Sequence, residues 1–329
     1  MTARRLPALV LTLAVLTAAC GSGAPAEDAA APAPAPAPAS TGPERSNGPL
    51  SPEALDAQVQ AWRDKHETEY RREWVSIAGL HFLEPGAQTF GRAVANDIVV
   101  SANVPDSLGR LVLSPEGSVT YEPAPGVAAT IKGEPVTGPA TLRDDSQKET
   151  DEFVVGSVRM VIHRSGDRLS LRVRDPEGQL ARGFLGFTWF DIDPAYRVTG
   201  RFIPDETPTE HAVLNTVGDL DHFTSDGVIE FTLKGETLRL RPFNRGERFY
   251  IVFRDASAGD ETYETARFLY ADRLPDGTTT LDFNEAYNPP CSFNPFTTCP
   301  IPLKENVLPV KILAGEKKYP VHPTLPTGE

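Results

Sequence analysis

Short β-branched runs separated by turn residues dominate the chain after residue 75 and limit what it can fold into. Runs such as Asp97–Val100, Leu108–Leu113 and Val154–His163 are each followed closely by Gly, Pro, Asn or Asp. No alternation of strands with helices appears, which argues against a parallel α/β sheet. The pattern predicts a mainly β protein made of antiparallel β-sandwich or barrel-like lobes.

One amphipathic helix is predicted before these strands. Leu55, Val59, Trp62 and Tyr70 recur at helical spacing among charged residues. Ser51 and Pro52 supply a capping side chain and a first-turn proline, the residues that commonly begin a helix. We therefore expect a helix from Pro52 to about Glu73.

The folded part is too long for one ordinary sandwich, because single domains most often contain about 100 to 150 residues. The stretch Asp144–Asp151 is the most polar interval after the N-terminal region. We expect two lobes: residues 51–150 with the helix and an N-terminal β lobe, and residues 151–320 with a C-terminal β lobe.

The N-terminus has the features of an export signal. Arg4 and Arg5 precede an apolar run, Leu6–Leu16, and small residues lead to Cys20. This pattern is similar to that of bacterial lipoprotein signals, which implies a lipid on Cys20 as the first mature residue. Residues 21–50 are rich in Ala and Pro and are expected to form a disordered tether. The folded part is then expected outside the cytoplasm, anchored to the cell membrane or the outer membrane.

Cysteine usage predicts a disulfide. If Cys20 carries lipid, only Cys291 and Cys299 remain, and an exported chain meets an oxidising compartment. A metal site is disfavoured, because no histidine lies between His222 and His322 and structural zinc has four ligands at recognisable spacing. No cofactor is expected.

The net charge of the chain is −13 at pH 7. Nucleic-acid binding requires clustered Lys and Arg, so it is not expected. The acidic residues are scattered along the sequence and favour solubility.

Residues 282–300, DFNEAYNPPCSFNPFTTCP, combine polar side chains with prolines between apolar runs. Asp282, Asn284, Tyr287 and Asn288 are candidate ligand-binding residues, with Arg267 as a further candidate. A second interpretation stays open: Asp and Asn often bond the backbone of turns. Under the first interpretation, the disulfide-tied segment lines a cavity.

A catalytic role would require two carboxyl groups held in different environments. The weak candidates are Asp255 and Glu261, which flank a glycine turn after a predicted strand, together with Asp282. Exposed acidic turns are common and offer an alternative explanation. No Gly-x-Ser-x-Gly motif occurs, and the six histidines are dispersed, so the sequence predicts no catalytic triad.

Several motifs follow one another along the chain: Gly79-Leu80-His81-Phe82-Leu83, Gly186-Phe187 with Trp189-Phe190, Asp282-Phe283-Asn284, Ala286-Tyr287-Asn288-Pro289-Pro290-Cys291 and Ala314-Gly315-Glu316-Lys317. In this order they resemble a bacterial family, the "domain of unknown function" numbered 1684. The resemblance covers about residues 55–320 and implies an architecture without an assigned reaction.

A weaker resemblance lies within residues 90–107. The run from Phe90-Gly91-Arg92 to Ser107 resembles the start of a forkhead-associated domain, a β-sandwich that binds phosphothreonine. Arg110 stands where that family has a histidine. The resemblance therefore implies a shared sandwich geometry without phosphopeptide binding.

Together these patterns predict a cell-envelope lipoprotein that binds a small polar ligand or an envelope partner through residues 282–300. The alternative is a secreted hydrolase that uses Glu261 or Asp255 together with Asp282. In both cases the membrane is contacted through the N-terminal lipid.

Overall fold

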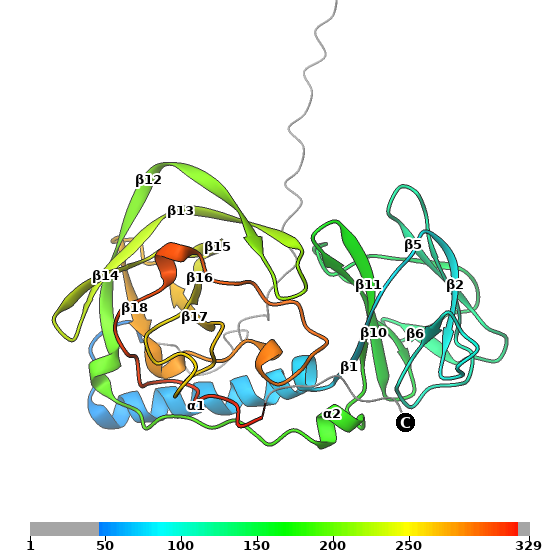
Figure 1. Ribbon diagram of the computed structural model, residues 1–329, viewed down its shortest axis with the longest axis horizontal. Coiled ribbons are helices and arrows are strands. Elements are labelled where there is room, and N and C mark those ends of the chain that lie inside the picture. Colours follow the sequence, from blue (N-terminus) through cyan, green and yellow to red (C-terminus); the bar gives the residue numbers. More distant parts are fainter. Residues whose placement is uncertain (1–45, 322–329) are drawn as a thin grey trace, which may run out of the picture.

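The structure is a computed structural model that describes residues 46–321. It is mainly β and has two lobes joined side by side (Figure 1). The expected signal peptide, the lipid-carrying Cys20 and nearly all of the tether lie outside the described residues. Among residues 46–321, no helix is long and apolar enough to cross a membrane.

The predicted N-terminal helix is confirmed as α1 (Pro52–Tyr70), which continues into one turn of π-helix, η1 (Arg71–Val75). The Ser51 side chain accepts a hydrogen bond from the Ala54 N–H and so caps the first turn. Helix α1 packs beneath the C-terminal lobe, away from the strands that directly follow it (Figure 1).

The first lobe is an antiparallel β-sandwich with one parallel pair, β2 with β3. Its two sheets enclose a core in which Phe153 stacks on Tyr121 at 4.9 Å and meets the edge of Phe90 at 6.2 Å. One sheet contains, in spatial order, β1 (Ile77–Phe82), β11 (Arg168–Arg174), β10 (Val158–Ser165), β9 (Phe153–Val155), β6 (Ala129–Ile131) and β7 (Glu134–Pro135). The other contains β3 (Ile98–Val99), β2 (Gly86–Gly91), β4 (Gly109–Leu113), β5 (Val119–Pro123) and β8 (Ala140–Leu142).

The run that resembles a forkhead-associated domain forms β2, β3 and the loop after them. Arg92 lies there, but its guanidinium donates to the Asp106 carboxylate at 2.9 and 3.1 Å. Arg110 pairs with Glu122 across β4 and β5. Both arginines are therefore neutralised by carboxylates of the chain itself.

The second lobe contains two further antiparallel sheets, and α1 packs against it. The first sheet contains β14 (Glu236–Leu240), β13 (Leu220–Leu233), β12 (Arg197–Leu214) and β18 (Thr278–Asp282). The second contains β15 (Phe243–Arg245), β16 (Arg248–Phe253) and β17 (Arg267–Asp272). Both sheets are open at their ends, so this lobe is not a closed barrel within the described residues.

The change from one lobe to the other falls near residue 175. Strands β9 to β11 belong to the same sheet as β1, and their side chains enter the core of the first lobe. The expected boundary at residue 150 lies between β8 and β9, inside the sandwich. A short helix, α2 (Gln179–Arg182), and an irregular stretch then lead into the second lobe.

Sheet β15–β16–β17 separates two cores because alternate residues of a strand face opposite sides. In β16, Phe249, Ile251 and Phe253 face one core, together with Leu281 and Phe283. Tyr250 and Val252 face the other core, which also contains the aromatic residues of α1 and η1. This second core contains the candidate site.

Candidate functional site

Residues 282–300 are part of the protein core and do not form an exposed loop. Nearly every side chain from Asp282 to Asn294 is buried. Two short 3-10 turns, η3 (Phe283–Glu285) and η4 (Pro290–Ser292), shape the backbone. The segment runs from the end of β18 to the junction of the lobes. Because its side chains are buried, its polar groups face the interior.

Asp282 and Asn284 were predicted to share a surface that binds a ligand. They do meet, because Asn284 Nδ2 donates to Asp282 Oδ1 at 2.9 Å. Asn284 also exchanges two hydrogen bonds with the backbone of Asp193, at 2.9 and 3.0 Å. Arg197 lies 3.6 Å from Asp282. These contacts fix the loop before β12 to the segment, in agreement with the second interpretation of the sequence.

Arg267 and Asp255 form a fully buried ion pair. Arg267 also donates to the backbone oxygens of Ala314 and Ile312, at 2.5 and 2.9 Å. Asp255 accepts the Ser257 N–H at 2.8 Å. A buried charge that loses its partner is strongly destabilising, so this pair belongs to the framework of the lobe.

Each of the three carboxylates considered for hydrolysis lies beside a cation of the chain. Asp255 binds Arg267, Glu261 binds Lys311 at 2.8 Å, and Asp282 lies beside Arg197. Asp255 and Glu261 lie in the same turn after β16, but each carboxylate is neutralised by its own cation. This arrangement gives no support to an acid and base acting on one substrate.

The predicted disulfide is wrong in this structure, where Cys291 and Cys299 are free thiols. The Cys299 sulfur accepts a hydrogen bond from the Cys291 N–H at 3.3 Å, and the Cys291 thiol meets the Tyr263 hydroxyl at 3.6 Å. The number of cysteines shows that a pair is available, but it does not show whether the two side chains point toward each other. Asn294 secures the turn instead, by donating to the backbone oxygens of Trp74 and Ile77 at 3.2 and 2.8 Å.

Four buried tyrosines from distant parts of the chain gather in the core that α1 covers. We call this set the tyrosine cluster; it comprises Tyr70, Tyr250, Tyr270 and Tyr287. Tyr250 and Tyr270 are direct partners on β16 and β17, with ring centroids 5.0 Å apart. Tyr70 and Tyr287 meet edge to face at 5.6 Å.

Helix α1 and the turn after it contribute three residues to this region at a spacing of four. His66, Tyr70 and Trp74 lie on one face, since residues four apart are neighbours on a helix. The His66 ring stacks on Tyr70 at 4.5 Å and lies equally close to Tyr287. The tyrosine cluster therefore depends on the helix as well as on the sheet.

Several polar atoms around the cluster have no hydrogen-bonding partner among residues 46–321. They are His66 Nε2, Trp74 Nε1, the Tyr250 hydroxyl, Asn288 Oδ1 and Ser292 Oγ. Native proteins satisfy about 90% or more of such buried groups. Each unsatisfied group costs about 1 to 3 kcal/mol of folding free energy. Trp74 and Tyr250 belong to the same core, and His66 packs on its rings, so this region is a candidate binding site.

The phenols of the cluster, His66 and Glu316 are uncharged at neutral pH. Burial raises the pKa of Tyr70, Tyr250 and Tyr287 well above the ordinary value of a phenol. Burial raises the pKa of Glu316 to about 8, and it lowers the pKa of His66 to about 3. Glu316 accepts the Asn288 N–H at 2.8 Å. The site therefore offers neutral donors and acceptors beside aromatic rings.

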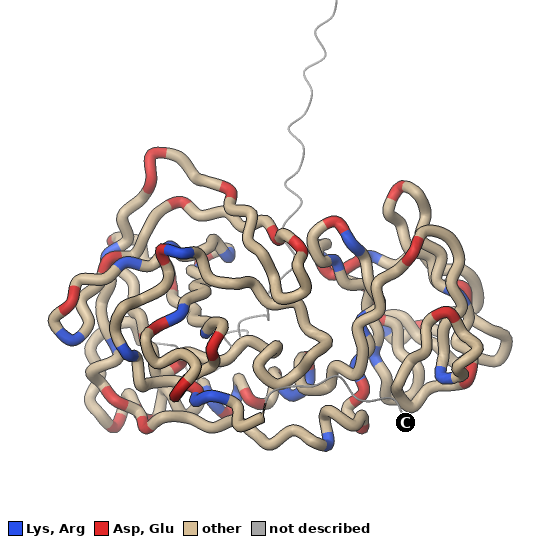
Figure 2. Tube along the Cα trace, viewed as in Figure 1, with Lys and Arg blue, Asp and Glu red and all other residues tan. Residues whose placement is uncertain are grey.

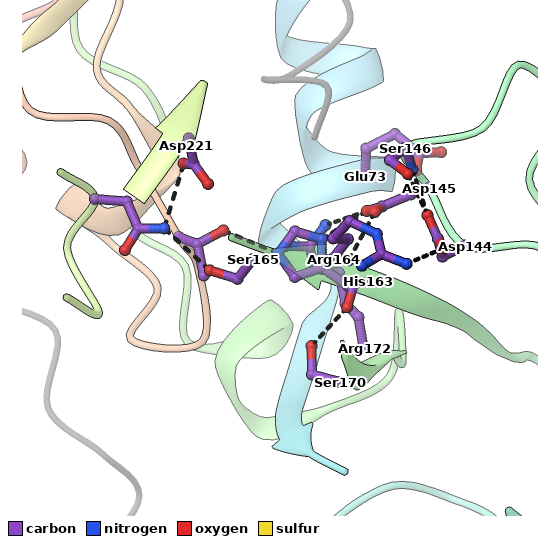
Figure 3. A network of polar contacts seen from close by, with 12 residues as sticks. Glu73, Asp144, Asp145, Ser146, His163, Arg164, Ser165, Ser170, Arg172 and Asp221 are labelled. Atoms are coloured by element: carbon purple, nitrogen blue, oxygen red, sulfur yellow. Dashed lines mark hydrogen bonds and ion pairs between the residues drawn. The ribbon is translucent and has the colours of Figure 1, made fainter. Parts of the chain in front are cut away.

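A second polar network joins the two lobes (Figure 3). His163 on β10 contacts Asp145 through Nδ1 at 2.7 Å and Thr298 through Nε2 at 2.9 Å. Arg172 on β11 lies 3.3 Å from the same Asp145 carboxylate. Burial, followed by the positive charge of Arg172, lowers the pKa of His163 to about 4. Burial opposes ionisation of Asp145, yet the adjoining His163 and Arg172 lower its pKa to about 2.

The structure brings Tyr287 and Asn288 together at the candidate site, but not the other predicted residues. Asp282, Asn284 and Arg267 make framework contacts elsewhere in the lobe. Sequence reasoning missed His66, Trp74 and Tyr250. The spacing of four residues between His66, Tyr70 and Trp74 is the signal that it could have used.

The comparisons with known proteins identify the family. A family model described as "Protein of unknown function (DUF1684)" matches residues 182–317. A solution NMR structure of an uncharacterized protein from Haloarcula marismortui is 32% identical, covering 44% of this chain and 82% of that chain, with a TM-score of 0.37. No curated protein matches. The chain belongs to the DUF1684 family, as the motifs indicated.

The shifted pKa values predict a stability maximum near pH 6.5. Below that pH, the unfolded chain protonates both histidines, whereas native His66 and His163 stay neutral until about pH 3 and 4. Stability therefore falls toward acid, by on the order of 1 kcal/mol per pH unit for each histidine. Glu316 has the opposite effect on stability. The stability that its raised pKa contributes is fully present below pH 4.5 and is lost as the pH rises through about 8.

Urea unfolding at pH 5, 6.5 and 8 measures this profile. Glu316→Gln should flatten the fall between pH 6.5 and 8, and His66→Phe should reduce the fall toward pH 5 while preserving ring stacking. If the Glu316→Gln variant loses as much stability between pH 6.5 and 8 as wild type, another group causes that loss.

Proposed function

We propose that this protein is an exported, lipid-anchored binding protein of the cell envelope, and that the tyrosine cluster in its C-terminal lobe binds a small polar molecule. One observation carries the proposal: residues of one aromatic core, Trp74 and Tyr250, have buried hydrogen-bonding atoms without partners in the described chain. Ligand sites typically combine aromatic walls with a few placed polar groups.

The unpartnered atoms indicate the chemistry of the ligand. Trp74 Nε1 can only donate, Asn288 Oδ1 can only accept, and the Tyr250 hydroxyl can do both. A suitable molecule therefore has donors and acceptors on a body that packs against rings. An ion without an organic body would leave most of these contacts unused.

The connection to the N-terminal segment supports placing the C-terminal lobe nearest the anchor. Asn47 donates to Asp272 at 3.0 Å, and its backbone oxygen accepts from Thr280 at 2.7 Å. Arg197 donates to the Ser46 oxygen at 2.7 Å. Residues 46–48 are therefore attached to the lobe that contains the tyrosine cluster.

The anchor is tested by replacing Cys20. Cys20→Ala should abolish labelling by radioactive palmitate and move the protein from the membrane fraction to the soluble fraction, because the acyl chains provide the attachment. Cys291→Ala serves as the matched control and should stay labelled. Unchanged labelling of the Cys20→Ala protein would disprove lipidation at this residue.

The ligand is tested by extracting the full-length protein, purified under native conditions from its own cells, and analysing the extract by mass spectrometry. Wild type should retain one small molecule, and Tyr250→Phe should retain at least tenfold less, because a hydroxyl directed at the ligand is removed. Tyr121→Phe, a buried tyrosine of the first lobe, is the control. An extract of wild type that contains no molecule enriched over Tyr250→Phe would refute small-molecule binding and leave an envelope partner as the alternative.

A hydrolase is the second candidate, favoured by the junction network and not by the predicted carboxylates. Thr298, His163 and Asp145 are joined hydroxyl to imidazole to carboxylate, in the order of a catalytic triad. In that reaction Thr298 Oγ1 would attack an ester carbonyl while its proton passes to His163 Nε2. The proton would then pass to the departing alcohol, and water would release the acid.

Hydrolysis of p-nitrophenyl acetate tests this candidate. Thr298→Ala should reduce the rate by about 100-fold or more, because the nucleophile is lost, whereas Thr298→Ser should retain activity. Thr120→Ala, in the first lobe, is the control. Equal rates in wild type and Thr298→Ala would leave the network with only a structural role in joining the lobes.

A further inference from the structure

Two arginines face each other at the end of sheet β15–β16–β17. Arg245 on β15 and Arg248 on β16 are direct partners across the antiparallel pair. Like charges directly opposite one another destabilise a sheet. Arg248 is neutralised, because its Nε lies 3.0 Å from the Asp272 carboxylate on β17. Arg245 therefore contributes the uncompensated charge of the pair.

Arg245 has no hydrogen bond or ion pair with any of the residues 46–321. Its Nε and Nη2 atoms are buried and without partners. Arg245 is half-buried, whereas other arginines without such a partner, such as Arg201 and Arg254, are exposed. Acidic and basic residues are interspersed over both lobes (Figure 2). Three other arginines of this lobe each bind a carboxylate: Arg239 binds Glu230, Arg241 binds Asp205 and Arg273 binds Asp226.

The strand register places Arg245 on the face that carries the tyrosine cluster. Arg248 and Tyr250 are two residues apart on β16 and share that face, and Arg245 and Phe243 lie opposite them on β15. The Arg245 guanidinium also lies 5.8 Å from the centre of the Phe223 ring. Its positive charge acts on the phenols of Tyr250 and Tyr270. The half-buried Arg245 thus lies at the edge of the aromatic core that contains the tyrosine cluster.

We propose that Arg245 binds the carboxylate of an organic acid whose apolar body packs against the tyrosine cluster. This inference rests on the proposed function and names the class of its ligand. The Nε and Nη2 hydrogens form the edge of a guanidinium that binds both oxygens of a carboxylate. The buried Tyr250 hydroxyl, which lacks a partner in the described chain, offers a further donor on the same face.

The charge balance favours a singly charged carboxylate over a phosphate. Arg248 is already paired with Asp272, so one positive charge is available. A phosphate dianion would bring a second negative charge into a core whose other groups are neutral phenols and a protonated Glu316. An organic monoanion matches both the single charge and the aromatic surroundings.

The experiment uses full-length protein with benzoate and octanoate as probes. Benzamide and octanol are the neutral counterparts, and inorganic phosphate is the alternative anion. Calorimetry and thermal unfolding should show that at least one acid binds wild type at least tenfold more tightly than its neutral counterpart. Arg245→Gln should weaken this binding at least tenfold, and Arg245→Lys should be intermediate because it retains the charge without the planar edge. Arg239→Gln, an exposed arginine on β14, should bind as wild type.

Unfolding of the ligand-free variants checks the interpretation independently. Removing an unpaired, partly buried charge should leave the melting temperature of Arg245→Gln equal to or above that of wild type. A lower melting temperature would show that Arg245 stabilises the fold and would overturn its assignment to a ligand.

Three other outcomes overturn the inference. These are equal binding of the acids by wild type and Arg245→Gln, phosphate binding as tight as acid binding, and no binding of either acid at millimolar concentration. If the molecule extracted from wild type is neutral and Arg245→Gln retains it, this inference fails while the proposed function stands. If the extract contains no enriched molecule, the proposed function itself fails.

Discussion

The alternation of side chains along sheet β15–β16–β17 is the constraint on which the second lobe depends. One face of β16 supplies Phe249, Ile251 and Phe253 to an apolar core, and the other supplies Tyr250 to a core rich in hydroxyl groups. A slip of one residue in the register would exchange these faces. The buried pair of Arg267 and Asp255 lies at the start of β17 and just beyond the end of β16, and it opposes such a slip.

Much of the architecture follows from local patterns in the sequence. The cap at Ser51 and the apolar spacing of Leu55 and Val59 determine where α1 begins and which face it buries. Gly, Pro, Asn and Asp at turns divide the strands. These signals act over a few residues, which is why the helix, the mainly β class and the family could be predicted.

The candidate site could not be predicted in the same way, because its members are far apart in the chain. His66, Tyr250 and Tyr287 meet only through the packing of α1 against the sheet and residues 282–300. The polar character of Asp282 and Asn284 was recognised, but sequence does not reveal that they bond the backbone of a neighbouring loop. The two thiols, likewise, lie close together without the geometry of a bond.

The position of α1 determines which fragments of the chain keep an intact core. The matched region, residues 182–317, contains the sheets of the second lobe but omits the helix that covers their aromatic face. A fragment cut at those limits would expose Tyr287 and Phe293 to water and lose the stacking of His66 and Tyr70. The boundaries drawn from sequence similarity therefore leave out a helix that completes the core of the matched region and that precedes the sandwich in the chain.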